Sequence, residues 1–226
     1  MRPMRPTMAL LRKELRLEWR TREAIPAMAL FSVTTYIVFH FGLQRDTVDG
    51  PLAAGILWVT LLFAAMLGAN RLFVADAEGG ALEGVLLAPI DRTALYLAKV
   101  IAFAGFLAVV EVVAVPAFYL LLLGPAGGDA VPGLLAVLVL ADVGIALTGT
   151  LVSGLATQTR SRELLVSLLG LPLLLPVIIA AARGTAPLFA AGGSEGLSLK
   201  WVAVLALYDL IIGLIALAVF DFLLED

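Results

Sequence analysis

Six long apolar stretches dominate this sequence and restrict what the chain can fold into. Each holds about 20 mostly apolar residues, the length that an α-helix needs to cross the hydrocarbon core of a bilayer. The stretches cover residues 24–43, 52–73, 94–123, 131–156, 164–182 and 201–224. Of the 226 residues, 62% are hydrophobic, which exceeds what the core of a soluble domain can bury. The sequence therefore predicts an all-α integral membrane protein with six transmembrane helices, in one domain over residues 1–226.

The positions of lysine and arginine predict how the helices are oriented. Of the 15 basic residues, 12 lie before the first stretch, between the second and third, or between the fourth and fifth, with residues at the stretch ends included. The opposite side holds Arg45, Arg183 and Lys200. Because cytoplasmic flanks carry the excess of basic residues, we expect both termini in the cytoplasm. The net charge of −3 at pH 7 offers no basic surface for nucleic acid.

Residues 8–22, ahead of the first stretch, have the pattern of an amphipathic helix. Its apolar positions recur at helical spacing and are Met8, Leu11, Leu15 and Trp19. A stripe of arginines lies beside them, at Arg12, Arg16 and Arg20. We expect this helix to lie in the membrane interface, with its arginines near anionic headgroups. The alternative is a basic flank that only sets the topology.

The segment between the second and third stretches has the pattern of a short helix between breakers. Gly79 and Gly80 interrupt the preceding helix, and Pro89 ends the next one because it forces Ala88 out of helical geometry. Such a helix would lie across the cytoplasmic surface and meet a soluble partner through its charged residues; the alternative is an ordinary solvated loop. The residues expected to contact that partner, or to hold the helix in place, are Asp76, Glu78, Leu82, Glu83, Leu86, Pro89 and Arg92.

Prolines and acidic residues inside the stretches are unusual for membrane helices. Pro172 and Pro176 each remove a backbone donor, so we expect the fifth helix to be bent or broken near its middle. Acidic side chains are costly inside a bilayer, and they occur at Glu111, Asp142 and Asp209. These acids either line a polar path or a subunit contact, or they are protonated and hydrogen-bonded to a neighbouring helix.

The chain lacks the common motifs of catalysis. It has no Gly-x-x-x-x-Gly-Lys-Ser/Thr phosphate loop and no Gly-x-Ser-x-Gly elbow. It has no cysteine and one histidine, His40, so a multi-histidine metal site and a serine triad are both excluded. We therefore expect no catalytic, cofactor-binding or metal-binding residue in this chain, and any energy from nucleotide must come from a partner.

Several motifs resemble those of a known family of membrane permeases. After the second stretch the sequence carries Arg71-Leu-Phe, Asp76, Gly80, Leu82-Glu83, Pro89 and Lys99. Elsewhere it carries Glu14-Leu15-Arg16, Arg22-Glu23, Gly55-Ile-Leu-Trp58-Val, Arg162-Glu163-Leu-Leu and Leu171-Pro172-Leu-Leu-Leu-Pro176. From about Leu10 to the sixth stretch, the chain resembles the permeases of ABC-2-type exporters, and most of all the haem exporter protein B (CcmB) family. Asn70 departs from the pattern, because family members carry an acidic residue before the Arg-Leu-Phe run.

The resemblance implies a fold and a role. The fold would be six spans, an N-terminal interfacial helix, and a cytoplasmic coupling helix between spans two and three. The role would be the permease subunit of a heteromeric ABC transporter for cytochrome c maturation in the bacterial inner membrane. Its partners would be a separate ATPase subunit, a second permease copy and haem-handling membrane subunits. Haem would be a transported or handled ligand; His40 is then either a ligand to haem iron or an interfacial polar residue.

Two other functions stay open on the sequence alone. An ABC-2 permease could export another substrate, such as a lipid-linked or drug-like molecule. A proton-coupled secondary carrier could use the three acids within the stretches and would need no nucleotide. An ABC-2 permease requires an ATPase, whether it works in haem export or exports another substrate.

Overall fold

The computed structural model describes most of the chain, and every regular element in that part is a helix. The described residues are 4–45, 47–72, 92–124, 130–157, 162–191 and 195–223. Six helices are long and apolar enough to cross a membrane, which confirms the prediction of an all-α protein with six such spans. Their bounds are Ala24–Gly42 (α2), Gly50–Arg71 (α3), Arg92–Phe118 (α6), Val131–Ala156 (α7), Arg162–Thr185 (α8) and Leu199–Leu223 (α9).

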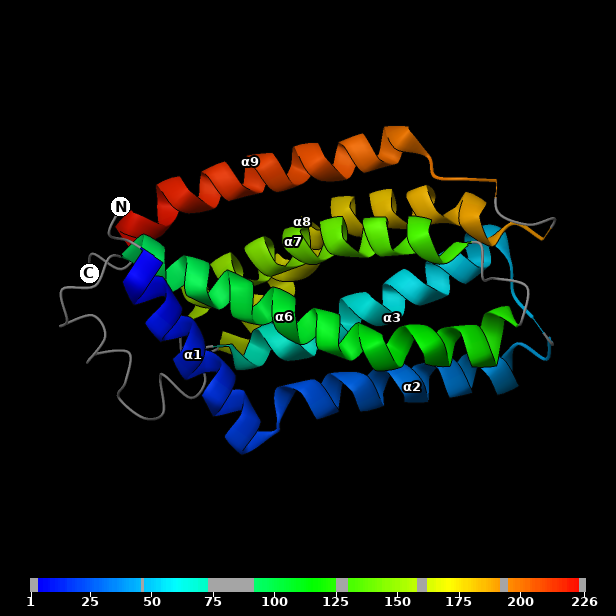
Figure 1. The fold of residues 1–226 in the computed structure, drawn as a ribbon, viewed down its shortest axis with the longest axis horizontal. Coiled ribbons are helices and arrows are strands. Elements are labelled where there is room, and N and C mark those ends of the chain that lie inside the picture. Colours follow the sequence, from blue (N-terminus) through cyan, green and yellow to red (C-terminus); the bar gives the residue numbers. More distant parts are fainter. Residues whose placement is uncertain are drawn as a thin grey trace.

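Shorter elements extend or flank these helices. A π-helix, η1 (Tyr119–Leu123), continues α6, and a 3₁₀-helix, η3 (Ala186–Phe189), continues α8. The N-terminal helix α1 (Met4–Thr21) crosses one end of the bundle obliquely (Figure 1). We call this end the α1 end and the opposite one the distal end. The first residue of α1 and the last of α9 both lie at the α1 end, as an even number of spans requires.

The spans run side by side along the long axis of the molecule (Figure 1). α3 and α7 are central, with 72% and 67% of their spans buried. α3 packs against α2 and α8, whereas α7 packs against α6, α8 and α9. α2 and α9 are peripheral, with 22% of each span buried. The peripheral helices therefore present most of their surface to the surroundings.

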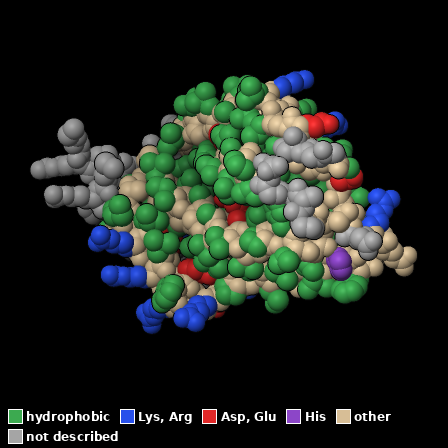
Figure 2. Space-filling model, turned by 45° about the vertical axis from the view of Figure 1, so that its right-hand side comes forward, with side chains coloured by type: hydrophobic (Ala, Val, Ile, Leu, Met, Phe, Trp, Pro, Cys, Tyr) green, Lys and Arg blue, Asp and Glu red, His purple; other side chains and the backbone are tan. Residues whose placement is uncertain are grey.

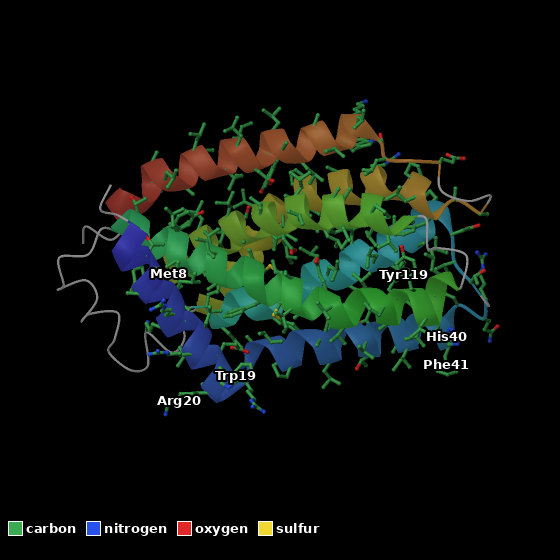
Figure 3. The ribbon with its side chains drawn as sticks, viewed as in Figure 1. Met8, Trp19, Arg20, His40, Phe41 and Tyr119 are labelled. Atoms are coloured by element: carbon green, nitrogen blue, oxygen red, sulfur yellow. The ribbon has the colours of Figure 1, made fainter. Side chains whose placement is uncertain are left out.

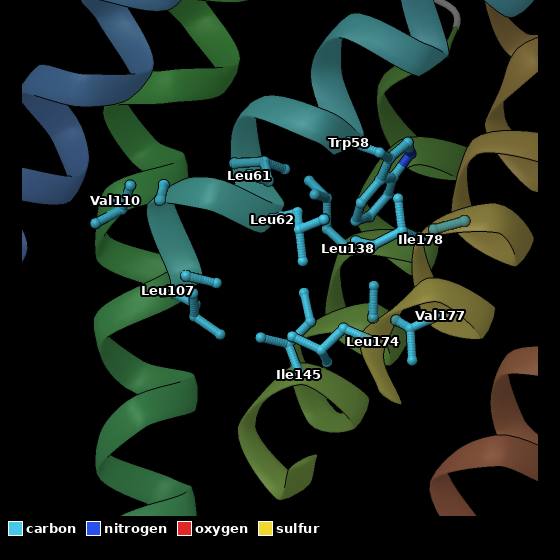
Figure 4. Close-up of a cluster of buried hydrophobic side chains, with 14 of the residues drawn as sticks. Trp58, Leu61, Leu62, Leu107, Val110, Leu138, Ile145, Leu174, Val177 and Ile178 are labelled. Carbon is cyan, nitrogen blue, oxygen red and sulfur yellow. The ribbon is translucent and has the colours of Figure 1, made fainter. Parts of the chain in front are cut away.

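An apolar core fills the space between the central helices, with side chains from α3, α6, α7 and α8 (Figure 4). Phe103 of α6 shows how closely they pack, because its ring lies between Gly68 of α3 and Gly149 of α7. A Cβ atom at either glycine would lie 2.8 Å from that ring. Lipid tails are as apolar as leucine, so helices in a bilayer associate through this kind of close packing.

Large apolar side chains also cover the outside of the bundle. Leu207, Leu210 and Leu214 of α9 are each more than half exposed. Hydrophobic side chains spread over most of the face in Figure 2, with Lys and Arg toward its margins. Monomeric soluble proteins rarely expose so large a contiguous apolar surface, whereas lipid tails cover one without cost.

α1 exposes most of the residues that its amphipathic pattern picked out, although Leu11 is partly buried against the bundle. Met8 and Trp19 are 51% and 76% exposed, so they point away from the protein. The basic stripe is exposed as well and consists of Arg12, Arg16 and Arg20. Apolar and basic side chains exposed together are what an interfacial helix offers to headgroups and acyl chains. The location of α1 in the membrane interface stays a prediction.

The prolines of the fifth span do not interrupt it. α8 is assigned as one helix through Pro172 and Pro176. Of the two expected outcomes, a break is therefore wrong, and a bend stays a prediction. Membrane helices tolerate proline where neighbouring side chains satisfy the backbone groups that it leaves free.

Candidate functional site

The end of the bundle that carries α1 holds the described neighbours of the predicted coupling segment. That segment, residues 73–91, falls outside the described residues, so no geometry is given for Asp76, Glu78, Leu82, Glu83, Leu86 and Pro89. Arg92 begins α6, and its side chain is likewise outside the description. What can be described is how the two flanking elements, the end of α3 and the start of α6, are held.

Lys99 joins three elements at the α1 end. Its Nζ donates hydrogen bonds to Glu14 Oε2 of α1 at 2.9 Å and to the Leu72 carbonyl, just past α3, at 2.6 Å. The Lys99 and Glu14 side chains are only 1% and 7% exposed. Lys13 Nζ also contacts Glu14, 3.3 Å from Oε1. A charge this deeply buried is tolerated only when it is paired and hydrogen-bonded, and here both conditions are met.

A second ion pair at the same end is exposed. Arg71 Nη1, in the last turn of α3, lies 2.7 Å from Glu23 Oε2, at the start of α2. These side chains are 47% and 63% exposed. Exposed pairs of this kind contribute about 0–1 kcal/mol, since water already solvates both charges. This pair therefore connects α2 and α3 only weakly.

The end of α3 is also held by α7. The last carbonyls of a helix have no partner within the helix. Ser153 Oγ of α7 donates to the Ala69 carbonyl at 2.8 Å, and both residues are buried. One turn before Lys99 on α6, the Tyr96 hydroxyl donates to the Leu147 carbonyl of α7 at 2.9 Å. α3, α6 and α7 are thus fastened to one another on the side where the coupling segment leaves the bundle.

Trp58, singled out by the family resemblance, lies in the core of the bundle. It is fully buried, and its Nε1 donates to Thr185 Oγ1 at 2.9 Å. Thr185 in turn donates to the Ala181 carbonyl at 2.8 Å. The indole therefore links α3 to the C-terminal end of α8, and its buried N–H has the hydrogen-bond partner that such a group requires.

The acidic residues within the spans divide into a pair and a single acid. Glu111 of α6 and Asp142 of α7 share a side-chain hydrogen bond. Asp209 of α9 instead faces Gly144 of α7, where a Cβ atom would lie 2.5 Å from Asp209 Oδ1. Asp142 and Gly144 are two positions apart on one helix, so they point in nearly opposite directions. The structure thus brings two of the three acids together and places the third on another face of α7.

Tyr208 connects the last span to the proline-containing turn of α8. Its hydroxyl donates to the Leu173 carbonyl at 2.6 Å and lies 3.0 Å from Thr148 Oγ1 of α7. Leu173 follows Pro172 directly and precedes Pro176 by less than one turn. Proline lacks the N–H that would donate to the carbonyl four residues before it, so Pro172 and Pro176 leave free the carbonyls of Leu168 and Pro172. The bond to Leu173 joins α9 to the turn beside those carbonyls.

His40 has a structural partner at the distal end, where Figure 3 also shows Phe41 and Tyr119. Its Nδ1 donates to the Leu121 carbonyl in η1. The backbone N–H of Val48 donates to the next carbonyl, that of Leu122, at 2.8 Å. These bonds satisfy carbonyls at the end of the third span. Among the described residues, no group of three or more His, Cys, Asp or Glu could hold a metal ion.

Comparison with known proteins decides the family. Residues 5–223 match the family described as CcmB protein. This chain belongs to the CcmB family. A CcmB relative in Paracoccus denitrificans, named Heme exporter protein B, is 32% identical over 208 residues, which cover 89% of this chain and 92% of the relative. Proteins of the same name in Bradyrhizobium diazoefficiens and Rhodobacter capsulatus are also 32% identical, over 93% and 85% of this chain.

The pairing of Glu14 with Lys99 was not predicted from the sequence. Both residues stood in the motifs that resemble the CcmB family, yet nothing in their spacing joined them, because 85 residues separate them. One signal was available: Lys99 falls inside the third apolar stretch, where a charge needs a partner. The packing of α1 on α6 was needed to show that Glu14 is the acid that pairs with Lys99.

Proposed function

We propose that this CcmB-family chain is the permease subunit of a heteromeric ABC transporter for haem export in cytochrome c maturation. The observation that carries the proposal is the similarity to proteins named Heme exporter protein B, which extends over 89% of the chain in one relative and 93% in another. The relatives are matched over nearly their whole length, so the likeness is not confined to a shared membrane segment. Haem is a transported or handled ligand in this proposal and not a resident cofactor.

A separate subunit supplies the energy. The chain contains no phosphate-loop motif, so it does not bind and hydrolyse ATP in the usual way. The partners are an ATPase subunit, a second copy of the permease, and the haem-handling membrane subunits of the pathway. The chain itself acts as a transport subunit and not as an enzyme.

The ATPase docks on the segment between α3 and α6, through Asp76, Glu78, Leu82, Glu83, Leu86, Pro89 and Arg92. The glycine breaker and proline stop of this segment favour a short rigid helix. Its described flanks support the assignment, because Leu72 and Lys99 are hydrogen-bonded to each other at 2.6 Å and buried. Force applied to the segment therefore reaches fixed points in the bundle.

The α1 end faces the cytoplasm of a bacterium, and the chain lies in its inner membrane with both termini inside. Of the 15 basic residues, 12 fall on this side, including the exposed arginines of α1. An ATPase needs cytoplasmic nucleotide, so the same orientation suits the coupling segment.

The test is a deletion strain examined for haem covalently attached to c-type cytochromes. Loss of covalent haem, with normal amounts of the apoproteins and of b-type haem enzymes, is the expected result, and a plasmid copy should restore it. Normal covalent haem in the deletion strain would contradict the proposal. Transport of another substrate class by the purified complex with ATP would favour the wider ABC-2 reading, and transport without nucleotide would favour a secondary carrier.

A further inference from the structure

The contact between α1 and α6 contains more polar chemistry than its packing requires. Leu10 of α1 already packs against Leu95 and Ala98 of α6 in a small apolar cluster of its own. Glu14 and Lys99 place a buried ion pair beside that cluster. Replacing such a pair by apolar residues is often neutral or stabilising, so its presence is poorly explained by stability alone. What an ion pair adds is direction, because its hydrogen bonds hold only in one relative placement of the two helices.

The position of Lys99 connects the fixed placement of α1 to the coupling segment. The Leu72 carbonyl, one of its acceptors, belongs to the last described residue before the coupling segment. Lys99 itself lies on α6, two turns after the first residue of that helix, Arg92. The Lys99 ammonium is therefore hydrogen-bonded to one flank of the segment at Leu72. A short length of α6 connects it to the other flank at Arg92. α1 is bound to the same ammonium through Glu14.

We infer that Glu14 and Lys99 are positioning residues that make α1 move with the flanks of the coupling segment. This inference rests on the proposed function, since it assumes that an ATPase moves those flanks. Displacement of α6 or of the end of α3 changes the position of Lys99 Nζ, and α1 follows because its Glu14 carboxylate is hydrogen-bonded to that ammonium in a buried contact. α1 is then a moving part of the transporter and not only a membrane anchor.

The experiment uses the purified complex with its ATPase in nanodiscs and pairs of spin labels on introduced cysteines. The chain has no cysteine of its own, so each copy carries only the introduced pair, and mixing labelled with excess unlabelled permease keeps one labelled copy in each complex. Labels at Leu97 and Leu164 report the movement of α6 relative to α8, and labels at Arg20 and Leu164 report the movement of α1. All three positions are exposed. Distances are measured without nucleotide and with nucleotide trapped in the ATPase.

The key variant is Glu14→Gln with Lys99→Met, which removes the connection without leaving a buried charge. In the wild type, both distances should change with nucleotide. In the double variant, the Leu97–Leu164 change should persist while the Arg20–Leu164 change is lost. Lys99→Arg, with Glu14 unchanged, keeps a cation at this position and should retain the Arg20–Leu164 change. Glu23→Gln, which removes only the exposed pair, is the matched control and should leave both changes intact.

Three results would overturn the inference. An Arg20–Leu164 change that persists in the double variant shows that α1 follows by other contacts. An Arg20–Leu164 distance that is constant in the wild type, while Leu97–Leu164 responds, shows that α1 is static. If neither distance responds in the wild type, the proposed coupling itself fails, and the inference fails with it.

Discussion

The α1 end and the distal end of the bundle are held together by different chemistry. At the α1 end, a buried ammonium and carboxylate join α1, α3 and α6. At the distal end, His40 and the Val48 amide donate to backbone carbonyls of η1, and Phe118 packs against Tyr36 and Phe189 with ring centroids 5.6 Å apart in both pairs. Removing one partner of a buried ion pair is strongly destabilising, whereas an ordinary hydrogen bond contributes less. This difference fits an end that receives force and an end that does not.

The largest expected effect is that of Lys99→Met alone. Among the described residues, the substitution leaves the buried Glu14 carboxylate with Lys13 as its ionic partner, and losing one partner of a buried pair costs about 3–5 kcal/mol. We expect a large fall in the unfolding midpoint and in the yield of folded protein, measured by thermal unfolding of the purified chain in detergent. Adding Glu14→Gln should recover most of the loss. A single variant as stable as the wild type would show that the pair is not the buried contact described here.

An intermediate effect is expected for His40→Phe at the distal end. The phenyl ring keeps the apolar volume but cannot donate to the Leu121 carbonyl, so the loss is that of one hydrogen bond, about 0.5–1.5 kcal/mol. The same unfolding measurement should place this variant between Lys99→Met and the wild type. A loss as large as that of Lys99→Met would remove the contrast between the two ends.

The smallest effect is expected for Glu23→Gln at the α1 end. It breaks the ion pair with Arg71, but that pair is exposed, and pairs of this kind contribute about 0–1 kcal/mol. The unfolding midpoint should hardly change. The change should be smaller still at high salt, because salt already screens the pair in the wild type. A destabilisation comparable to that of Lys99→Met would mean that charge, and not burial of charge, distinguishes this end.

The sequence predicted the spans well because lipid leaves few choices. An apolar stretch of about 20 residues has no other stable fate in a bilayer than a helix. Contacts between spans depend on rotation about each helix axis, which the apolar pattern hardly specifies. For that reason the sequence could not say which of the three acids lie together, whereas the structure pairs Glu111 with Asp142 and places Asp209 against Gly144 on another face of α7. The sequence left open whether Pro172 and Pro176 bend or break the fifth helix; α8 is continuous through both, which excludes the break, and the bend stays a prediction.

The measurement that tests the central claim most directly is ATP hydrolysis by the purified complex in nanodiscs, with co-purification of the ATPase as its companion. The claim is that energy enters this chain through the segment between α3 and α6. Glu83→Lys reverses a charge and Leu86→Asp removes an apolar contact in that segment, and neither alters a span. Both variants should insert normally but lose the ATPase or uncouple its hydrolysis. If both assemble and hydrolyse ATP at wild-type rates and still support covalent haem attachment, this segment is not where the energy enters.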